Sequence, residues 1–233
     1  MHTKMRINRF FLTALAVFLP VWCLAQDSYP YVSPTATYLN DEGEETESTD
    51  NITGQAPLTV TFHANPSDID GHTPSYEWHF RMEGESTDMM VRYEEDTEYT
   101  FTTAGVTRVT LYFKPDVGEE ALDSTVFTVT VSESKLIFPN AFSPNGDDIN
   151  DKFKAKEYQS LVEFHAYIFN RWGQKLYEWT DPSEGWDGTY NGKDVKEGVY
   201  FLLCKAKGAD GREYNIRKDV NLLRGYTETT SDN

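Results

Sequence analysis

The side chains most able to do chemistry lie between residues 138 and 153, where amides and carboxylates are held between apolar residues. We expect Phe138, Phe142, Ile149 and Phe153 to anchor this segment to a core. Four of the polar side chains bring hard oxygen atoms into one short turn: Asn145, Asp147, Asn150 and Asp151. Calcium loops have this composition, but the bidentate Glu that completes an EF-hand is missing downstream. The same residues also suit a turn that satisfies its own hydrogen bonds. We favour the turn without metal and keep calcium as the alternative; no other cofactor is expected.

The same turn could supply paired carboxylates for a hydrolase, with Asp147 and Asp151 as the pair. Acid–base hydrolysis needs a nucleophile, a base and an orienting group together, and no such set occurs in the sequence. The spacing of His63, His72 and His79 matches no standard zinc pattern. We therefore predict a non-enzymatic protein whose histidines lie at the surface.

Residues 1–25 have the pattern of a cleaved secretory signal peptide. Three basic residues precede an apolar run from Phe10 to Trp22, and the segment Cys23-Leu-Ala25 follows it, with cleavage expected after Ala25. Lipid attachment at Cys23 is the competing interpretation, but the bulky Trp22 stands where lipidation favours a small residue. No later apolar run approaches the roughly 20 residues of a membrane-spanning helix, so we expect no transmembrane segment.

Composition limits the remaining choices. The chain has 233 residues, 39% of them hydrophobic, and a formal charge of −17, which favours two compact domains and argues against nucleic acid or anionic lipid as a partner. Loss of three basic residues with the signal peptide takes the charge from −17 to −20. Cys204 is then the only cysteine, so no internal disulfide can form, and its alternation with apolar neighbours predicts a small buried residue.

The elements that must position these residues are strands. From Asp27 to Ser132 apolar residues alternate with polar ones in short runs separated by Gly, Asp and Pro, which is typical of an antiparallel sandwich. The clearest runs are Leu58–Phe62, Tyr76–Phe80, Val109–Phe113 and Phe127–Val131. The acidic segment Asp41–Asp50 interrupts them, and self-repulsion predicts a solvated, mobile loop there.

These runs resemble the strands of a PKD domain. The markers are Ala56-Pro-Leu-Thr-Val-Thr-Phe62, Tyr76-Glu-Trp-His-Phe80, and the segment Tyr99–Leu111 with its Thr-Ala-Gly turn. The family commonly continues Gly-Asp-Gly after the Trp strand, whereas this chain has Arg81-Met-Glu-Gly84. The resemblance implies an immunoglobulin-like domain over residues 27–133 that serves as a spacer or contacts a surface carbohydrate or protein ligand.

The C-terminal half has its own ordered markers. The strand Phe164–Asn170 is expected to be covered on both faces. It ends at the turn Asn170-Arg-Trp-Gly173, and a second aromatic turn lies at Gly185-Trp-Asp-Gly188. Asp210-Gly211 marks a hairpin between two later strands. With the entry segment Phe138–Phe153, this order resembles the gliding motility-associated C-terminal domain, the type B sorting domain of type IX secretion cargo. It spans about Lys135 to Arg224, within a domain of residues 134–225, and a flexible tail of residues 226–233 would follow. Asp148 departs from the usual Gly.

The resemblance implies a route and a set of partners. The chain would fold in the periplasm of a Gram-negative bacterium and be carried to the cell surface or the extracellular space by the type IX outer-membrane translocon and associated outer-membrane proteins. Exposed aromatic and Arg residues make strong interface contacts, and the candidates for translocon recognition are Arg171, Trp172, Trp186, Asp187 and Arg224. Core packing remains the alternative for both tryptophans.

We therefore expect an all-β protein: a signal peptide followed by two tandem immunoglobulin-like antiparallel β-sandwiches. Its expected role is that of an exported, non-enzymatic surface or extracellular protein with a PKD module for adhesion or spacing. The alternative is an accessory component of the secretion or gliding machinery at the outer membrane.

Overall fold

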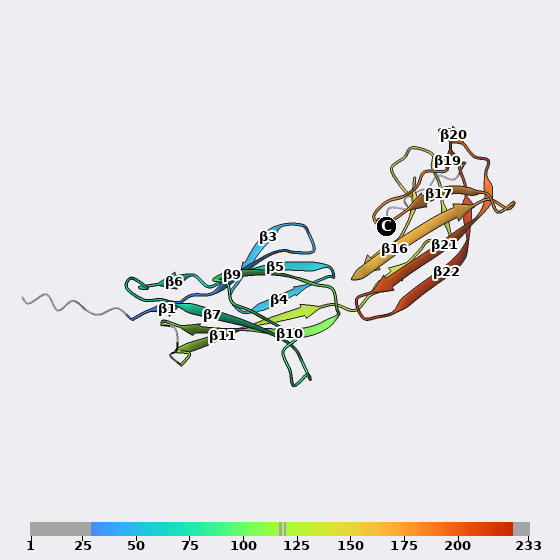
Figure 1. Cartoon of the computed structure of the whole chain (residues 1–233). Coiled ribbons are helices and arrows are strands. Elements are labelled where there is room, and N and C mark those ends of the chain that lie inside the picture. The colour runs from blue at the N-terminus through green and yellow to red at the C-terminus, as the bar shows by residue number, and fades with distance from the viewer. Residues whose placement is uncertain (1–28, 117, 119, 226–233) are drawn as a thin grey trace, which may run out of the picture.

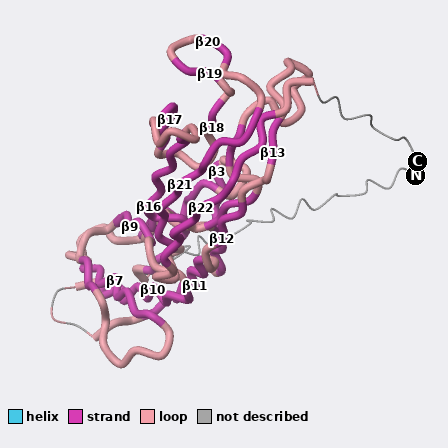
Figure 2. The backbone as a smooth tube through the Cα atoms, turned by 90° about the vertical axis from the view of Figure 1, so that its right-hand side faces the viewer, coloured by secondary structure: helices cyan, strands magenta, loops and turns pink. Residues whose placement is uncertain are grey.

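In the computed structural model, residues 29–116, 118 and 120–225 are described, and every regular element within them is a β-strand (Figures 1 and 2). The all-β fold predicted from the alternating pattern is confirmed. The signal peptide, Cys23 and the tail of residues 226–233 lie outside the described residues. No helix in the described part of the chain is long and apolar enough to cross a bilayer.

The N-terminal unit consists of two facing sheets and a small strand pair. The first sheet has the order β3-β2-β5-β9 (Glu45–Ser48, Thr35–Leu39, Leu58–His63, Asp96–Phe101). The second has the order β4-β11-β10-β7-β8 (Asn51–Gly54, Asp123–Val131, Gly105–Lys114, Ser75–Met82, Met90–Arg92). The pair is β1 with β6 (Tyr31–Val32, Pro66–Ser67). All these pairings are antiparallel except β4 with β11.

Aromatic side chains from both sheets fill the space between them, because every second residue of a strand points to the same face. The ring of Phe62 on β5 lies 5.7 Å from that of Trp78 on β7 and 5.4 Å from that of Phe127 on β11. All three side chains are fully buried. The indole N–H of Trp78 donates to the carbonyl of Glu94 at 3.1 Å, so its one polar atom is satisfied.

The C-terminal unit is built on one long sheet with the order β13-β22-β21-β16-β17 (Ala141–Phe142, Glu213–Leu222, Gly198–Gly208, Leu161–Phe169, Lys175–Trp179). Three short pairs accompany it: β12 with β15 (Lys135–Ile137, Glu157–Gln159), β14 with β18 (Phe153–Lys154, Gly185–Trp186), and β19 with β20 (Thr189–Tyr190, Lys193–Asp194). One face of the long sheet is buried against residues of the entry segment and the short strands, and Cys204 lies in this core with no exposed surface. The burial predicted for Cys204 is therefore confirmed.

Three local expectations need correction. The acidic segment is no open loop, because Glu45–Ser48 forms β3 against β2, and the Asn40 side chain accepts the backbone amides of Glu42 and Glu44 at the turn. Ile149 is 40% exposed and does not anchor the entry segment, whereas Phe138, Phe142 and Phe153 are buried as expected. Only one face of β16 is fully covered; the other is half-buried.

The two units lie end to end (Figure 1), and the tip of the β21–β22 hairpin touches the N-terminal unit. Ala209 at this tip packs in the N-terminal core, and its carbonyl accepts the backbone amide of Ala104 at 2.9 Å. Because β21 and β22 run away from this junction, their opposite end is turned away from the N-terminal unit (Figure 1).

Candidate recognition surface

The oxygen-rich turn is organised around the carboxylate of Asp151. Its oxygens accept the backbone amides of Asn145, Gly146 and Asp148 at 2.8–2.9 Å. These bonds hold the pKa of Asp151 below its usual range, and the bond from the amide of Gly146 has the largest effect. Asp148 and Asn150 adopt left-handed backbone angles, with φ of 65° and 54°. The geometry is that of the self-satisfied turn.

No second observation supports a metal at this turn. The side chain of Asp147 accepts the backbone amide of Ile149 at 2.9 Å and the amide group of Asn145 at 2.9 Å, so its oxygens also have partners within the turn. Among the described residues, no cluster of three or more His, Cys, Asp or Glu side chains is arranged to hold a metal ion. Calcium binding at this turn remains the untested alternative.

The histidines of the N-terminal unit are each paired with a different aspartate rather than with one another. In all three pairs the Nδ1 atom lies 2.7–2.8 Å from a carboxylate oxygen: His63 with Asp96, His72 with Asp116, and His79 with Asp88. The pairing holds the pKa of Asp116 below its usual value through the His72 contact, whereas that of Asp88 is lowered first by Arg81 and then by His79. These contacts tie strands and loops together and form no shared site.

Of the five predicted recognition residues, Arg171, Trp172 and Asp187 are exposed, and the first two share one turn. Arg171 and Trp172 occupy the turn between β16 and β17, where the Oδ1 atom of Asn170 accepts the backbone amides of Trp172 and Gln174 at 3.0 Å. The Trp172 side chain is 79% exposed, and the Arg171 guanidinium lies 4.8 Å from its ring centroid. An ordered turn therefore presents an aromatic ring and a cation together.

Trp186 is buried inside the fold, whereas the neighbouring Asp187 is exposed and holds its own turn together. Trp186 has no exposed surface, packs 5.4 Å from the ring of Phe142, and donates its indole N–H to the carbonyl of Thr189 at 2.8 Å. The Asp187 carboxylate accepts the backbone amide of Thr189 at 2.9 Å and its hydroxyl at 2.8 Å. For Trp186 the alternative of core packing is the one observed, so this side chain is not available to a partner that binds the folded surface.

Arg224 joins three loops near the end of β22. Its guanidinium donates to the carbonyls of Gly188 at 2.7 Å, Pro144 at 3.3 Å and Val195 at 3.4 Å. A carboxylate oxygen of Asp194 lies 3.3 Å away. These contacts give Arg224 a structural role at the point where the entry segment and the aromatic turn meet the last strand.

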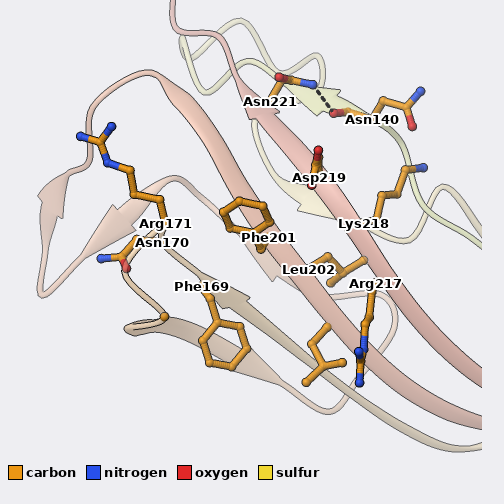
Figure 3. Close-up of a pocket in the computed structure, with 12 residues that line it drawn as sticks. Asn140, Phe169, Asn170, Arg171, Phe201, Leu202, Arg217, Lys218, Asp219 and Asn221 are labelled. Atoms are coloured by element: carbon orange, nitrogen blue, oxygen red, sulfur yellow. Dashed lines mark hydrogen bonds between the residues drawn. The ribbon is translucent and has the colours of Figure 1, made fainter.

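A groove that the sequence did not reveal adjoins the Arg171–Trp172 turn. It is open to solvent, has a volume of about 940 Å³, and crosses the outer face of β16, β21 and β22 (Figure 3). Phe169, Phe201 and Asp219 are directly paired across the three strands. Arg171 and Arg217 lie at opposite ends of the residues drawn, with Phe169 and Phe201 between them in this view. In the sequence, the only sign of this groove is that the apolar residues Val199, Phe201 and Leu203 alternate along β21 on the face opposite Cys204.

Residues 136–218 match the family model of the CHU_C Type IX secretion signal domain. This match lies within the C-terminal unit and contains its Arg171–Trp172 turn and most of the residues that line the groove. The C-terminal half of the chain is therefore similar to a type IX sorting domain, as the sequence markers indicated. No curated protein matches the chain.

Several solved structures are similar at low identity. Dimeric latent PorU from Porphyromonas gingivalis has 13% identity and a TM-score of 0.25, with 85% of this chain and 20% of that chain covered. A tetra-tandem repeat from the extending region of a large adhesion protein has 9% identity and a TM-score of 0.29, with 84% and 68% covered. SGBP-B of the mixed-linkage glucan utilization locus of Bacteroides ovatus, in complex with a mixed-linkage heptasaccharide, has 14% identity and a TM-score of 0.27, with 81% and 47% covered. The chain thus spans about a fifth of PorU and about half of SGBP-B.

Proposed function

We propose that this protein is exported cargo of a type IX secretion system, delivered to the cell surface or released outside the cell. The observation that carries the proposal is the match of residues 136–218 to a type IX secretion signal domain. A cleaved signal peptide over residues 1–25 would supply the first step, transfer to the periplasm.

The N-terminal unit is the passenger in this proposal. Its two facing sheets and its strand markers support a PKD-like module that acts in adhesion or as a spacer, with a surface carbohydrate or protein as the ligand. The three histidines form separate pairs with aspartates, and the carboxylates of the oxygen-rich turn are engaged by backbone amides. Each set of residues that could do chemistry therefore has a structural role, which supports a non-enzymatic protein.

The turn of Arg171 and Trp172 is the proposed contact with the outer-membrane translocon. Trp and Arg are two of the residue types enriched at the energetic centres of protein interfaces, and this turn exposes one of each. Truncation of a residue at such an energetic centre costs about 2 kcal/mol or more of binding free energy, which corresponds to a loss of about thirtyfold in affinity.

A reporter fusion tests the proposed route. A periplasmic reporter joined to residues 135–233 should appear outside the cell, and the same reporter joined to residues 27–133 should stay in the periplasm. In the native protein, deletion of residues 136–225 should trap the passenger in the periplasm. Export of the deleted protein would refute the proposal. Loss of export of other cargo in a strain lacking the gene would favour the machinery role instead.

A further inference from the structure

The charge of the protein is divided unequally between its two units. Residues 29–133 contain 4 Lys and Arg against 21 Asp and Glu, which gives 4 − 21 = −17, whereas residues 134–225 contain 14 of each and are neutral. An acidic partner is therefore repelled by the N-terminal unit and meets no net repulsion at the C-terminal unit.

The groove on the outer face of β16, β21 and β22 is positive within this acidic protein. Two cations on this face line it, Arg171 and Arg217, against the single carboxylate of Asp219, whereas Lys218 alternates with them on β22 and points to the inner face. Lys218 donates to the carbonyl of Phe138 at 2.7 Å. Within the described residues, neither Arg171 nor Arg217 has a carboxylate within ion-pair distance. Both guanidinium groups can therefore pair with a carboxylate of a partner molecule.

Between the two arginines the groove offers an apolar floor. Phe201 is 39% exposed on β21, and Phe169 is half-buried on the neighbouring strand. Val199, two residues before Phe201 and 48% exposed, lines an adjoining depression. This depression, which also contains Trp172, shares Asn170 and Arg171 with the groove. Exposed aromatic side chains and unpaired arginines thus form one continuous surface, a composition typical of protein interfaces.

The groove also lies well clear of the acidic unit. Ala209 at the junction lies eight positions after Phe201 along β21 and its turn, which is about 25 Å along an extended strand. The Debye length is about 8 Å at physiological ionic strength, so the N-terminal charges act only weakly at that distance. The local arginines therefore determine what the groove attracts.

We propose that this groove, defined by Phe169, Arg171, Phe201 and Arg217, is the surface through which the C-terminal unit docks on a carboxylate-bearing protein segment of the export machinery. Carboxylates of the partner pair with Arg171 and Arg217, and an apolar side chain between them covers Phe201. The proposal rests on the proposed function and adds to it the chemistry of the partner and the face that is recognised.

Export of the full-length chain tests the docking surface. Arg217→Glu and Phe201→Ser should each lower the exported fraction by about tenfold or more, because one reverses the charge and the other removes the apolar contact. Arg217→Lys keeps the charge and should retain most of the export. The matched controls are Lys154→Glu, an exposed lysine on β14, and Ile137→Ser, which is 41% exposed on β12 of the same unit. Both should be exported normally.

Thermal melting of each purified variant separates a docking defect from a folding defect. If Arg217→Glu melts at a lower temperature than the native protein, Arg217→Gln replaces it, since it removes the charge without adding a repulsive one. Normal export of Arg217→Glu, Arg217→Gln and Phe201→Ser would overturn the proposal. So would normal export with loss of attachment to the cell surface, because the groove would then bind a surface ligand such as a glycan.

The two proposals fail in different ways. If deletion of residues 136–225 blocks export while the groove variants are exported normally, the groove proposal is wrong and the secretion route stands. If the deleted protein is still exported, the route itself is wrong.

Discussion

The hydroxyl of Ser160 accepts the backbone amide hydrogen of Ala56 at 3.2 Å, although 104 residues separate them in the chain. The same hydroxyl lies 2.8 Å from the hydroxyl of Ser132, at the end of the N-terminal unit. Ser160 is buried and has a left-handed backbone angle, with φ of 45°. One side chain of the C-terminal unit thus ties two segments of the N-terminal unit.

Replacing Ser160 by alanine should destabilise the protein by about 1–2 kcal/mol, because the amide of buried Ala56 loses its partner. The melting temperature should fall by about 2–8 °C for a protein of this size, which calorimetry can measure. Ser132→Ala is the matched control, since it leaves the bond between Ser160 and Ala56 in place and should cost less. Equal losses for the two variants would contradict the role given to Ser160.

Cys204 should resist thiol reagents in the folded protein. Burial raises the pKa of its thiol to about 12, so at pH 8 only about one molecule in ten thousand carries the reactive thiolate. In a chain that begins at Asp27, labelling should be slow in buffer and fast in denaturant. Val199→Cys in a Cys204→Ser background is the control, because Val199 lies on the same strand with its side chain 48% exposed. Rapid labelling of the native chain would show that the core opens readily.

Strand positions could be predicted from the sequence where apolar residues alternate over several positions. Leu58–Phe62 and Tyr76–Phe80 follow this rule, and their apolar members are buried as expected. The rule fails in turns, where residues have no fixed period. Trp172 and Trp186 both stand in glycine-bounded turns, yet one is 79% exposed and the other fully buried. Trp186 is buried because the two-residue strand β18 pairs with β14, a contact between distant segments that no local pattern specifies.

The groove was hidden for a related reason. Its central residues Phe169, Phe201 and Asp219 come from three strands, and they meet only because the registers of two antiparallel pairings align them. A shift of one residue in either pairing would turn one of these side chains to the opposite face. Register depends on packing over the whole sheet, so an exposed aromatic patch of this kind becomes visible only in three dimensions.

The stability contributed by Asp151 should depend on pH in a defined direction. Its pKa is held below the usual value by the three amides it accepts, so its contribution is complete above about pH 4, the ordinary pKa of aspartate, and is lost as pH falls through the lower folded value. The melting temperature of Asp151→Asn should therefore lie below that of the native protein at pH 7 and approach it below about pH 4. In Asp148→Asn the gap should be small at every pH, because the Asp148 carboxylate accepts no hydrogen bond within the described part of the chain. A gap for Asp151→Asn that does not change with pH would contradict the assignment.

Calcium should leave the melting temperature of the full chain unchanged. The oxygens of Asp147 and Asp151 already accept hydrogen bonds from the turn, so a cation would have to displace them. Titration to millimolar calcium, with magnesium as the control, measures the effect. A rise in melting temperature that Asp151→Asn abolishes would instead establish the calcium site that the sequence left open.

Gly188, which lies before β19, and Gly192, which lies between β19 and β20, should differ in their tolerance of a side chain. Gly188 and Gly192 both have left-handed angles, with φ of 80° and 72°. A Cβ atom at Gly188 would lie 3.0–3.1 Å from atoms of Leu222, Arg224 and Pro144, whereas one at Gly192 would meet nothing within 4 Å. Gly192→Ala should therefore cost about 1–2 kcal/mol through the backbone angle alone, and Gly188→Ala about 2–4 kcal/mol because crowding is added. Urea unfolding of the two variants measures the difference, and equal costs would mean that the contacts of Arg224 shift freely and do not fix the end of the last strand.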